Sequence, residues 1–235
     1  MLKISRQADG TPEIFYSVQG EGISSGKPAV FLRLSLCNLA CSWCDTKYTW
    51  LFPSEDASRY IIKMSADEIA QIIMSYGCHL LVVTGGEPML QQKELLSLLK
   101  NLKQKGFNFE IETNGTILPE SEIVKLIDHW NISPKLNNSG NQSSLREKPE
   151  CYRFFNDLAS SHFKFVIDNE SDFQEVKTLA HKYGIRAEKI ILMPQAIDRQ
   201  ILLQKSRWLV ELCKSEGYLF SVRLQILLWG NKRGI

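Results

Sequence analysis

The sequence predicts an α/β protein whose mostly parallel sheet curls into a partial barrel, of the (β/α)6 type with about six βα units. Two observations support this. Short apolar runs alternate along the chain with segments that repeat leucine at helical spacing, as βα units do. Polar and cysteine-containing motifs follow several of these runs, and in parallel sheets functional residues gather at the carboxyl ends of the strands. The cysteine-containing motif and the active site are therefore expected at that rim.

Seven apolar runs are predicted to form the strands of this sheet, and the residues before the first run are expected to form an N-terminal loop. Each run is short and rich in β-branched or aromatic residues. The polar, Asn- and Ser-rich stretch 135–148 is expected to be a loop. The predicted strands are 30–36, 80–84, 108–112, 130–133, 163–167, 190–193 and 219–224.

Four longer helices are predicted between the strands, each of them stopped by a glycine. The first opens on a capping box formed by Ser65 and Glu68. The third opens at Ser171, with Gln174 three residues later. Glycine is the residue that most readily ends a helix in the left-handed conformation. The helices are expected at 65–76, 92–105, 171–183 and 200–216, with Gly77, Gly106, Gly184 and Gly217 after them.

Length and composition indicate one globular domain over 1–235, with an insertion at 47–63 between the first two strands. The 235 residues are 44% hydrophobic, and 28 basic and 26 acidic residues leave a net charge of +2. This balance does not favour a nucleic-acid or membrane partner. Neither a signal peptide nor a membrane-spanning run is evident, so a cytoplasmic location is expected. Cysteines stay reduced there, and clustered cysteines then favour metal binding or chemistry.

Three cysteines, Cys37, Cys41 and Cys44, lie within eight residues directly after the first apolar run. Three thiolates on one tight loop can hold three irons of a 4Fe–4S cluster and leave the fourth iron open to a substrate or cofactor. The alternative is a zinc site in a non-catalytic binding module. Zinc prefers four ligands, and a second Cys pair or an adjacent His is missing from the sequence. The other cysteines, Cys78, Cys151 and Cys213, stand alone.

The thiol spacing resembles that of the radical S-adenosylmethionine superfamily. Trp43 supplies the aromatic residue before the last cysteine, and Gly85-Gly86-Glu87-Pro88 after the second predicted strand matches the superfamily's second motif. The resemblance implies that S-adenosylmethionine chelates the open iron and is cleaved by one electron, and that the 5′-deoxyadenosyl radical abstracts a hydrogen from the substrate. Gly85 and Gly86 are expected to let the backbone approach the methionine moiety of this cofactor.

Further motifs narrow the resemblance to the 7-carboxy-7-deazaguanine synthase family, over most of the chain from about Phe15 to Gln195. They occupy 15–22, 28–33, 44–46, 111–116 and 133–135. The resemblance implies a lyase that contracts the ring of 6-carboxy-5,6,7,8-tetrahydropterin to 7-carboxy-7-deazaguanine, with loss of ammonia, in queuosine or deazapurine biosynthesis. It also implies that S-adenosylmethionine is regenerated and that Mg²⁺ takes part. A glycyl-radical enzyme activase is the alternative enzyme.

The resemblance also assigns site residues. The cluster ligands are Cys37, Cys41 and Cys44, and Thr46 is the magnesium position. S-adenosylmethionine is assigned to Trp43, Asp45, Gly86, Glu87, Thr113, Asn114, Ser133, Pro134, Lys135, Met193, Pro194, Gln195 and Ala196. The pterin substrate is assigned to Val18, Gln19, Gly20, Glu21, Arg33 and Thr84.

Three of these substrate residues can be interpreted from their own chemistry. Glu21 is suited to accept hydrogen bonds from a pterin ring N–H and its exocyclic amine, and Gln19 to bind the carbonyl; a solvated glycine-rich turn is the alternative. Arg33 lies inside an apolar run and offers a planar fork for the substrate carboxylate. Its alternative is a paired or solvent-facing strand position.

The resemblance further suggests a homodimer and a reducing partner such as flavodoxin or ferredoxin. In some family members the carboxylate of the last residue contacts the substrate. Whether Ile235 reaches the substrate in this way is left open by the sequence.

Overall fold

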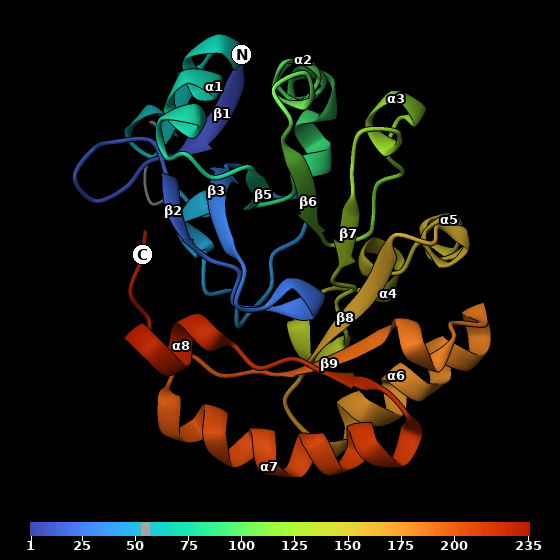
Figure 1. Cartoon of the computed structure of the whole chain (residues 1–235). Coiled ribbons are helices and arrows are strands. Elements are labelled where there is room, and N and C mark those ends of the chain that lie inside the picture. Colours follow the sequence, from blue (N-terminus) through green and yellow to red (C-terminus); the bar gives the residue numbers. More distant parts are fainter. Residues whose placement is uncertain (53–56) are drawn as a thin grey trace.

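The computed structural model describes residues 1–52 and 57–235, and its framework is a curved sheet with helices on its outer side (Figure 1). Parallel strands form most of the sheet, as the alternation of apolar runs and helical segments predicted. Their order from one edge is β10-β9-β8-β7-β6-β5-β3. These strands are β3 (Pro28–Leu34), β5 (Leu80–Gly85), β6 (Asn108–Thr113), β7 (His129–Ile132), β8 (Ser161–Ile167), β9 (Ile190–Pro194) and β10 (Leu219–Phe220).

Three antiparallel strands extend the sheet beyond β3, so the prediction of an N-terminal loop is wrong. They are β1 (Leu2–Ser5), β2 (Ile14–Val18) and β4 (Ile61–Met64). Both β1 and β2 pair with β3, and β4 pairs with β1. These strands are only four or five residues long, and their stability comes from pairing with a preformed neighbour, which local sequence patterns do not reveal.

The insertion predicted at 47–63 contains β4 and two short 3-10 helices. Phe52 stacks on Tyr60 with their ring centroids 5.6 Å apart. Residues 53–56 of the insertion lie outside the described residues. The described 3-10 helices of the chain are η1 (Gly22–Ser24), η2 (Lys47–Thr49), η3 (Ala57–Arg59), η4 (Pro88–Gln91), η5 (Asn137–Ser139) and η6 (Ala187–Lys189).

The predicted long helices are present, with two corrections to the predicted element boundaries. The Ser65 side chain and Glu68 form the expected capping box. The third long helix begins at Glu170 because Asn169 caps it together with Asp172, so the predicted start at Ser171 is wrong. Strand β10 ends at Phe220, residues 221–223 have no regular secondary structure, and a helix begins at Leu224, so the predicted strand 219–224 is too long. The helices are α1 (Ala66–Ser75), α2 (Gln92–Lys103), α3 (Ser121–Val124), α4 (Ser143–Arg146), α5 (Pro149–Asp157), α6 (Glu170–Tyr183), α7 (Arg199–Glu216) and α8 (Leu224–Trp229).

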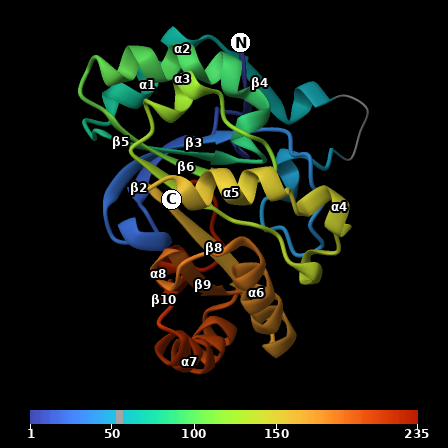
Figure 2. The same ribbon diagram turned by 90° about the vertical axis from the view of Figure 1, so that its right-hand side faces the viewer.

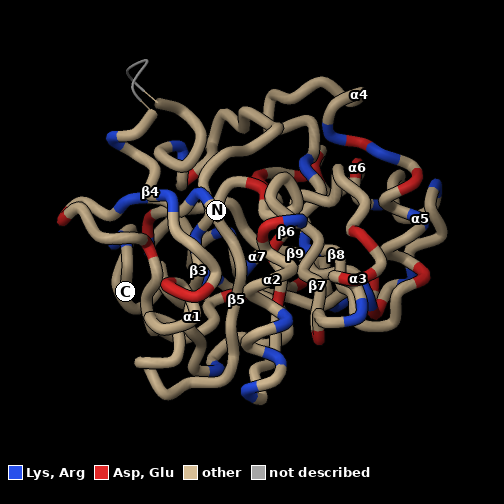
Figure 3. Tube along the Cα trace, turned by 90° about the horizontal axis from the view of Figure 1, so that it is seen from above, with Lys and Arg blue, Asp and Glu red and all other residues tan. Residues whose placement is uncertain are grey.

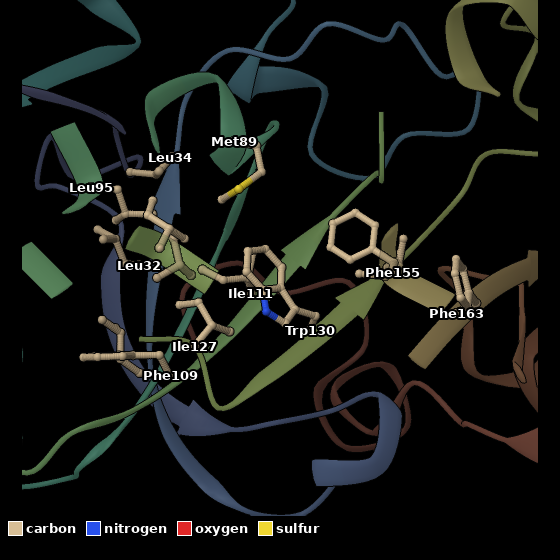
Figure 4. Close-up of a cluster of buried hydrophobic side chains, with 14 of the residues drawn as sticks. Leu32, Leu34, Met89, Leu95, Phe109, Ile111, Ile127, Trp130, Phe155 and Phe163 are labelled. Carbon is tan, nitrogen blue, oxygen red and sulfur yellow. The ribbon is translucent and has the colours of Figure 1, made fainter. Parts of the chain in front are cut away.

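The main hydrophobic core lies between the sheet and the surrounding helices (Figure 4). Phe109 and Ile111 of β6 and Trp130 of β7 are fully buried in it. Because side chains alternate along a strand, the residues between them point to the other face of the sheet. On β6 these are Glu110 and Glu112, so the inner face of the partial barrel is lined by polar side chains.

The two ends of the curved sheet approach each other near β2 and β10 without pairing as strands. The backbone N–H of Gly22 donates to Ser221 Oγ at 2.8 Å, and the N–H of Leu224 donates to the Gly20 carbonyl at 2.9 Å. Figure 2 shows α7 and α8 together at this end of the molecule. These contacts connect the segment that carries the predicted substrate residues to the last quarter of the chain.

Charged residues of both signs are spread along the chain (Figure 3). Among the described residues, no helix is long and apolar enough to cross a membrane.

Candidate active site

A cavity of about 520 Å³ opens at the carboxyl ends of the parallel strands, where the sequence placed the active site. Cavities of this size are typical of small-molecule sites. The structure brings nearly all of the predicted site residues to its wall. Those on the wall are Val18, Gln19, Gly20, Glu21, Arg33, Cys37, Cys41, Trp43, Cys44, Asp45, Thr46, Thr84, Gly86, Thr113, Asn114, Ser133, Lys135, Met193, Pro194 and Gln195. Glu87, Pro134 and Ala196 lie behind it.

The cysteine loop leaves β3 through a strained residue. Leu36, directly before Cys37, has a φ of 76°, which is unusual for a residue other than glycine. Its N–H donates to the Thr49 carbonyl at 2.7 Å, and its carbonyl accepts from the N–H of Glu87 at 2.8 Å. These two bonds hold Leu36 in the left-handed region and direct the thiols into the cavity.

The pair Gly85 and Gly86 is required by this close approach of two backbone segments. A Cβ on Gly85 would lie 2.0 Å from the carbonyl oxygen of Leu34, and one on Gly86 would lie 1.9 Å from that of Leu36. These glycines are predicted from the sequence to let the backbone approach the methionine moiety of a cofactor. In the structure, the backbone of Leu34 and Leu36 already explains why a side chain is excluded at both positions.

Glu87 holds two loops together from behind the cavity wall. Its fully buried carboxylate accepts hydrogen bonds from Thr113 Oγ1 at 2.7 Å, from the N–H of Asn114 at 2.7 Å and from the N–H of Met89 at 2.9 Å. Burial raises the pKa of Glu87 despite these bonds. The glutamate of the second motif is therefore a link between the β5 and β6 loops.

The three motif cysteines are free thiols that share one wall of the cavity. Burial raises the pKa of Cys37 to about 11 and also raises the pKa of Cys41, so iron binding at these residues would release protons. Among the described residues, no three His, Cys, Asp or Glu side chains converge on a single metal ion. Cluster thiolates each bind a different iron, so a cluster does not require such convergence.

The donor set fits a cluster because every one of these sulfur atoms has a neighbouring hydrogen-bond donor. The N–H of Leu39 lies 3.5 Å from Cys37 Sγ. Asn141 Nδ2 lies 3.3 Å from Cys41 Sγ, and Trp50 Nε1 lies 3.4 Å from Cys44 Sγ. Donors of this kind stabilise sulfur that carries negative charge.

The residues that the sequence assigns to S-adenosylmethionine form two groups beside the thiols. Lys135 Nζ lies 2.8 Å from Ser133 Oγ and 5.7 Å from the centre of the Trp43 ring. On the other side, Asp45 pairs with Arg223. Pro134 is buried behind Ser133 and Lys135. Ala196 is buried near α7, and its carbonyl accepts from Arg223 at 2.7 Å.

Glu21 lies among three hydrogen-bond donors. Lys164 Nζ lies 2.7 Å from its Oε2, while Gln225 Nε2 and Arg223 Nε lie 2.8 and 3.1 Å from its Oε1. Burial alone would raise the pKa of Glu21, but the ammonium of Lys164 and the guanidinium of Arg223 hold it well below its usual range. An ionised carboxylate accepts roughly four hydrogen bonds, and three donors already bind Glu21. About one acceptor position is therefore unused, whereas the predicted contact with a pterin needs two.

Gln19 and Lys164 connect this carboxylate to the inner face of the barrel. Gln19 Nε2 donates to Glu110 at 3.4 Å and to Glu112 at 3.3 Å, and its Oε1 accepts from the N–H of Glu21 at 3.2 Å. The Lys164 ammonium also bonds Glu112 Oε2 at 2.8 Å. The solvated turn considered for Gln19 is therefore wrong, because this side chain is buried.

Arg33 lies on the opposite wall, beside a fully buried carboxylate. Its Nε donates to Glu13 Oε1 at 3.0 Å, and the Tyr48 hydroxyl donates to the same oxygen at 3.0 Å. Arg33 lines the cavity, and within the described ranges its side chain binds Glu13 through Nε. Its two Nη groups are therefore available to bind an anionic group of a ligand. Burial would raise the pKa of Glu13, but the guanidinium of Arg33 and that of Arg233 lower it.

The C-terminal tail reaches the same carboxylate and closes one side of the cavity. Arg233 Nη2 lies 2.9 Å from Glu13 Oε2, and the Arg233 guanidinium lies 3.4 Å from the centre of the Tyr48 ring. Residues 231–235, including Ile235, belong to the cavity wall. Figure 1 shows the tail running back from α8 towards β2.

Thr46 follows the last thiol of the motif and also faces the cavity. Its Oγ1 lies 3.6 Å from Cys44 Sγ. A hydroxyl in this place is a suitable oxygen ligand for a hard cation such as Mg²⁺ when a substrate carboxylate supplies a second oxygen.

Several wall residues were not predicted from the sequence: Tyr48, Trp50, Glu112, Lys164, Arg223, Gln225 and the tail residues before Ile235. One signal was present. Lys164 interrupts the apolar run Ser161–Ile167, and a charged residue in such a strand needs a partner. The roles of Arg223 and Arg233 depend on which distant carboxylate the fold brings near, and the local sequence carries no sign of that.

Comparison with known proteins shows what the chain is similar to. Residues 33–135 match the model of the Radical SAM superfamily. A 7-carboxy-7-deazaguanine synthase from Pyrobaculum aerophilum is 35% identical over 94% of this chain and 95% of its own length. One from Rhodopirellula baltica is 32% identical over 94% of this chain and 87% of its own length. The crystal structure of QueE from Escherichia coli superposes with a TM-score of 0.71 and 25% identity, covering 95% of this chain and 94% of that one.

Proposed function

The chain belongs to the 7-carboxy-7-deazaguanine synthase family of the radical S-adenosylmethionine enzymes, and from this premise we propose how its cavity serves the family's reaction. The protein is a lyase of deazapurine biosynthesis that contracts the ring of 6-carboxy-5,6,7,8-tetrahydropterin to 7-carboxy-7-deazaguanine, with loss of ammonia. The observation that carries this function is the similarity of nearly the whole chain to these synthases. This similarity does not favour the two alternatives, a glycyl-radical enzyme activase and a zinc-stabilised binding module.

The superfamily implies a 4Fe–4S cluster and S-adenosylmethionine, and the thiol-lined wall fits both. When bound, these groups supply a 5′-deoxyadenosyl radical that abstracts hydrogen from the substrate. We propose that Cys37, Cys41 and Cys44 hold the cluster. The cavity wall beside the thiols supports this assignment, since it leaves room next to the sulfur atoms for a ligand of the fourth iron.

For S-adenosylmethionine we propose that the residues around the thiols bind different parts of one molecule. Lys135 and Ser133 suit the carboxylate and ribose, because an ammonium and a hydroxyl lie 2.8 Å apart at the wall. Trp43 and the end of β9, Met193 and Pro194, offer apolar surface to the adenine, and Gln195 follows them at the wall. Thr113, Asn114 and Gly86 form the floor between them. Glu87, Pro134 and Ala196 support these residues from behind without reaching the wall.

For the substrate we propose that Arg33 binds the carboxylate and that the segment Val18–Glu21, with Thr84, binds the pterin ring. Glu13 accepts a hydrogen bond from Arg33 Nε, and the two Nη groups of this cavity-lining residue remain to bind a carboxylate of the substrate. Glu21 is kept ionised by Lys164 and Arg223, so the roughly one acceptor position that its three donors leave unused is open to a ring N–H group. The polar inner face thereby matches a ligand rich in N–H donors.

Several further features stay proposals. Thr46 is proposed as a magnesium ligand, supported by its hydroxyl at the cavity wall. Residues 1–235 are proposed to act as one radical S-adenosylmethionine domain. A homodimer, a flavodoxin or ferredoxin as electron donor, and a cytoplasmic location are predicted from the sequence and the family.

An anaerobic turnover assay tests the function. The protein is reconstituted with iron and sulfide and supplied with dithionite, S-adenosylmethionine, Mg²⁺ and carboxytetrahydropterin. We expect 7-carboxy-7-deazaguanine as the product and about four irons per chain, as a cubane requires. Cys41→Ala should lose both the bound iron and the formation of product, because one iron of the cluster then has no protein ligand. Wild-type protein that carries the full cluster and cleaves S-adenosylmethionine but forms no deazaguanine product would contradict this function.

A further inference from the structure

We propose that Trp50 and Asn141, two residues outside the cysteine motif, are positioning residues for the cluster. Their N–H groups donate hydrogen bonds to Cys44 and Cys41, and these bonds raise the potential at which the cluster accepts an electron. The inference rests on the proposed function, because it concerns the same cluster. It goes beyond that function by assigning control of the cluster's redox behaviour to two named side chains.

Trp50 lies against Cys44 at the end of the short helix η2. Its Nε1 is 3.4 Å from Cys44 Sγ. The helix fixes the backbone from which this ring extends, since the N–H of Trp50 donates to the Lys47 carbonyl at 3.1 Å and the N–H of Thr49 donates to the Thr46 carbonyl at 2.9 Å. The indole N–H is a donor only, so its single hydrogen bond is directed at the sulfur.

Asn141 reaches Cys41 from a loop one hundred positions further along the chain. Its Nδ2 lies 3.3 Å from Cys41 Sγ, while its Oδ1 accepts from the N–H of Ala40 at 3.0 Å. One amide therefore binds both the backbone and the sulfur of the cysteine loop. Because Oδ1 already accepts from a backbone donor, the orientation that directs Nδ2 at the sulfur is the one that satisfies both ends of the amide.

The loop that carries Asn141 is itself fixed. Arg146 Nε donates to the Asn141 carbonyl at 3.2 Å, and Arg146 Nη1 bonds Glu175 of α6 at 2.7 Å. The Arg146 side chain is only 7% exposed. The amide is thus held by the framework of the protein, which allows it to position the cysteine loop.

The third thiol has a main-chain donor, the N–H of Leu39 at 3.5 Å from Cys37 Sγ. Each of the three sulfur atoms therefore has an N–H neighbour, although the donors come from three separate places in the chain. A neutral thiol is a weak acceptor, whereas a thiolate bound to iron is a good one. A hydrogen-bond donor beside each of the three sulfur atoms therefore suits iron-bound thiolates better than neutral thiols.

The consequence for the cluster follows from electrostatics. Reduction adds one negative charge, and N–H donors to the sulfur ligands stabilise the more negative state. Hydrogen bonds to the sulfurs are among the factors that set the potential of an iron–sulfur cluster. Removing either donor should therefore make the cluster harder to reduce, without removing an iron ligand.

An EPR-monitored redox titration with dithionite, in the absence of S-adenosylmethionine, tests the proposal. Trp50→Phe keeps an aromatic ring but has no N–H, and Asn141→Leu keeps the approximate shape of the amide without a donor. Trp208→Phe on α7 is the matched control, since Trp208 packs against the main core and is not part of the cavity wall. Iron content and the visible spectrum are measured for every variant.

We expect Trp50→Phe and Asn141→Leu to hold about four irons and to show more negative midpoint potentials than the wild type. The double variant should show the sum of the two shifts, because the donors act on different sulfurs. Trp208→Phe should have the wild-type potential. With ¹⁵N-labelled tryptophan, pulsed EPR of the reduced cluster should show a nitrogen coupling that is lost in Trp50→Phe and kept in Trp208→Phe.

Loaded variants with unchanged potentials would overturn the proposal and leave the proposed function intact. If Asn141→Leu does not hold a cluster, Trp50→Phe decides: an unchanged potential and an unchanged nitrogen coupling overturn the inference. A wild-type protein that binds no four-iron cluster would instead overturn the proposed function, and this inference with it.

Discussion

At the scale of single residues, the cavity is organised by buried charges that face one another across strands. Lys164 lies between Glu21 and Glu112 with its side chain only 3% exposed. Removing one member of such a group leaves an uncompensated buried charge, which typically costs about 3–5 kcal/mol. This explains why a lysine is tolerated in the middle of an otherwise apolar strand, and it ties the orientation of Glu21 to the stability of the sheet.

A buried histidine predicts a pH dependence of stability. His129 on β7 is 8% exposed and lies against His162 on β8, with ring centroids 5.1 Å apart. Its Nε2 has no hydrogen-bond partner among the described residues. Burial, with a smaller effect from His162, lowers the pKa of His129 from 6.5 to about 4. The folded protein therefore keeps this imidazole neutral where the unfolded chain binds a proton.

The free energy of unfolding should thus fall as the pH is lowered from about 6.5 to 4, by at most about 3 kcal/mol from this residue. Urea unfolding at a series of pH values measures the slope. His129→Gln, which stays neutral throughout, should make this slope shallower between about pH 6.5 and 5.5, above most of the range in which unfolded carboxylates titrate. An identical slope in the variant would show that His129 does not contribute.

At the scale of secondary structure elements, the site depends on how the loop after β5 packs against the end of β3. Gly86 has no room for a Cβ, which would lie 1.9 Å from the Leu36 carbonyl oxygen. The N–H of Gly86 also donates to the Leu34 carbonyl at 2.9 Å. The two loops therefore form one unit, and the position of the thiols depends on a glycine in the neighbouring strand connection.

Gly86→Ala should displace the cysteine loop and reduce iron incorporation, because the methyl group overlaps backbone that cannot move independently. Overpacking of this kind typically costs about 1–3 kcal/mol. Iron content after reconstitution and thermal unfolding measure the two effects. Gly77→Ala is the control: a Cβ there meets nothing within 4 Å, although φ is +66°. It should lower stability by about 1–2 kcal/mol and leave iron content unchanged. Normal iron content in Gly86→Ala would contradict this account.

At the scale of the whole molecule, the C-terminal tail meets the segment before β2 beside the cavity. Glu13, on the segment before β2, receives Arg33 from β3 and Arg233 from the tail. The tail segment Asn231–Ile235 consequently forms part of the wall that also carries the cysteines. The volume and charge of the site therefore depend on residues that lie more than two hundred positions apart.

Arg233→Ala should release the tail from Glu13 and weaken substrate binding while sparing the cluster. Hydrogen bonds between charged groups typically contribute about 1.5–3 kcal/mol, so we expect kcat/KM for the pterin to fall about tenfold or more. Anaerobic kinetics and iron analysis measure the two quantities. Arg207→Ala, an exposed position on α7, is the control. Unchanged kinetics for Arg233→Ala would remove the tail from substrate binding.

Local sequence patterns were enough to predict the parallel α/β framework, the strand ends that carry chemistry and the three thiols. Those features are local: hydrophobic periodicity, helix caps such as Ser65 and the spacing of Cys37, Cys41 and Cys44 are set by neighbouring residues. The folded chain was needed to show that Glu87 links two loops and that Arg223 joins Glu21 to Asp45. It was likewise needed to show that Asn141 reaches Cys41. These pairings arise when the sheet curls and brings distant segments together, and a buried charge or donor takes the partner that the fold places within reach.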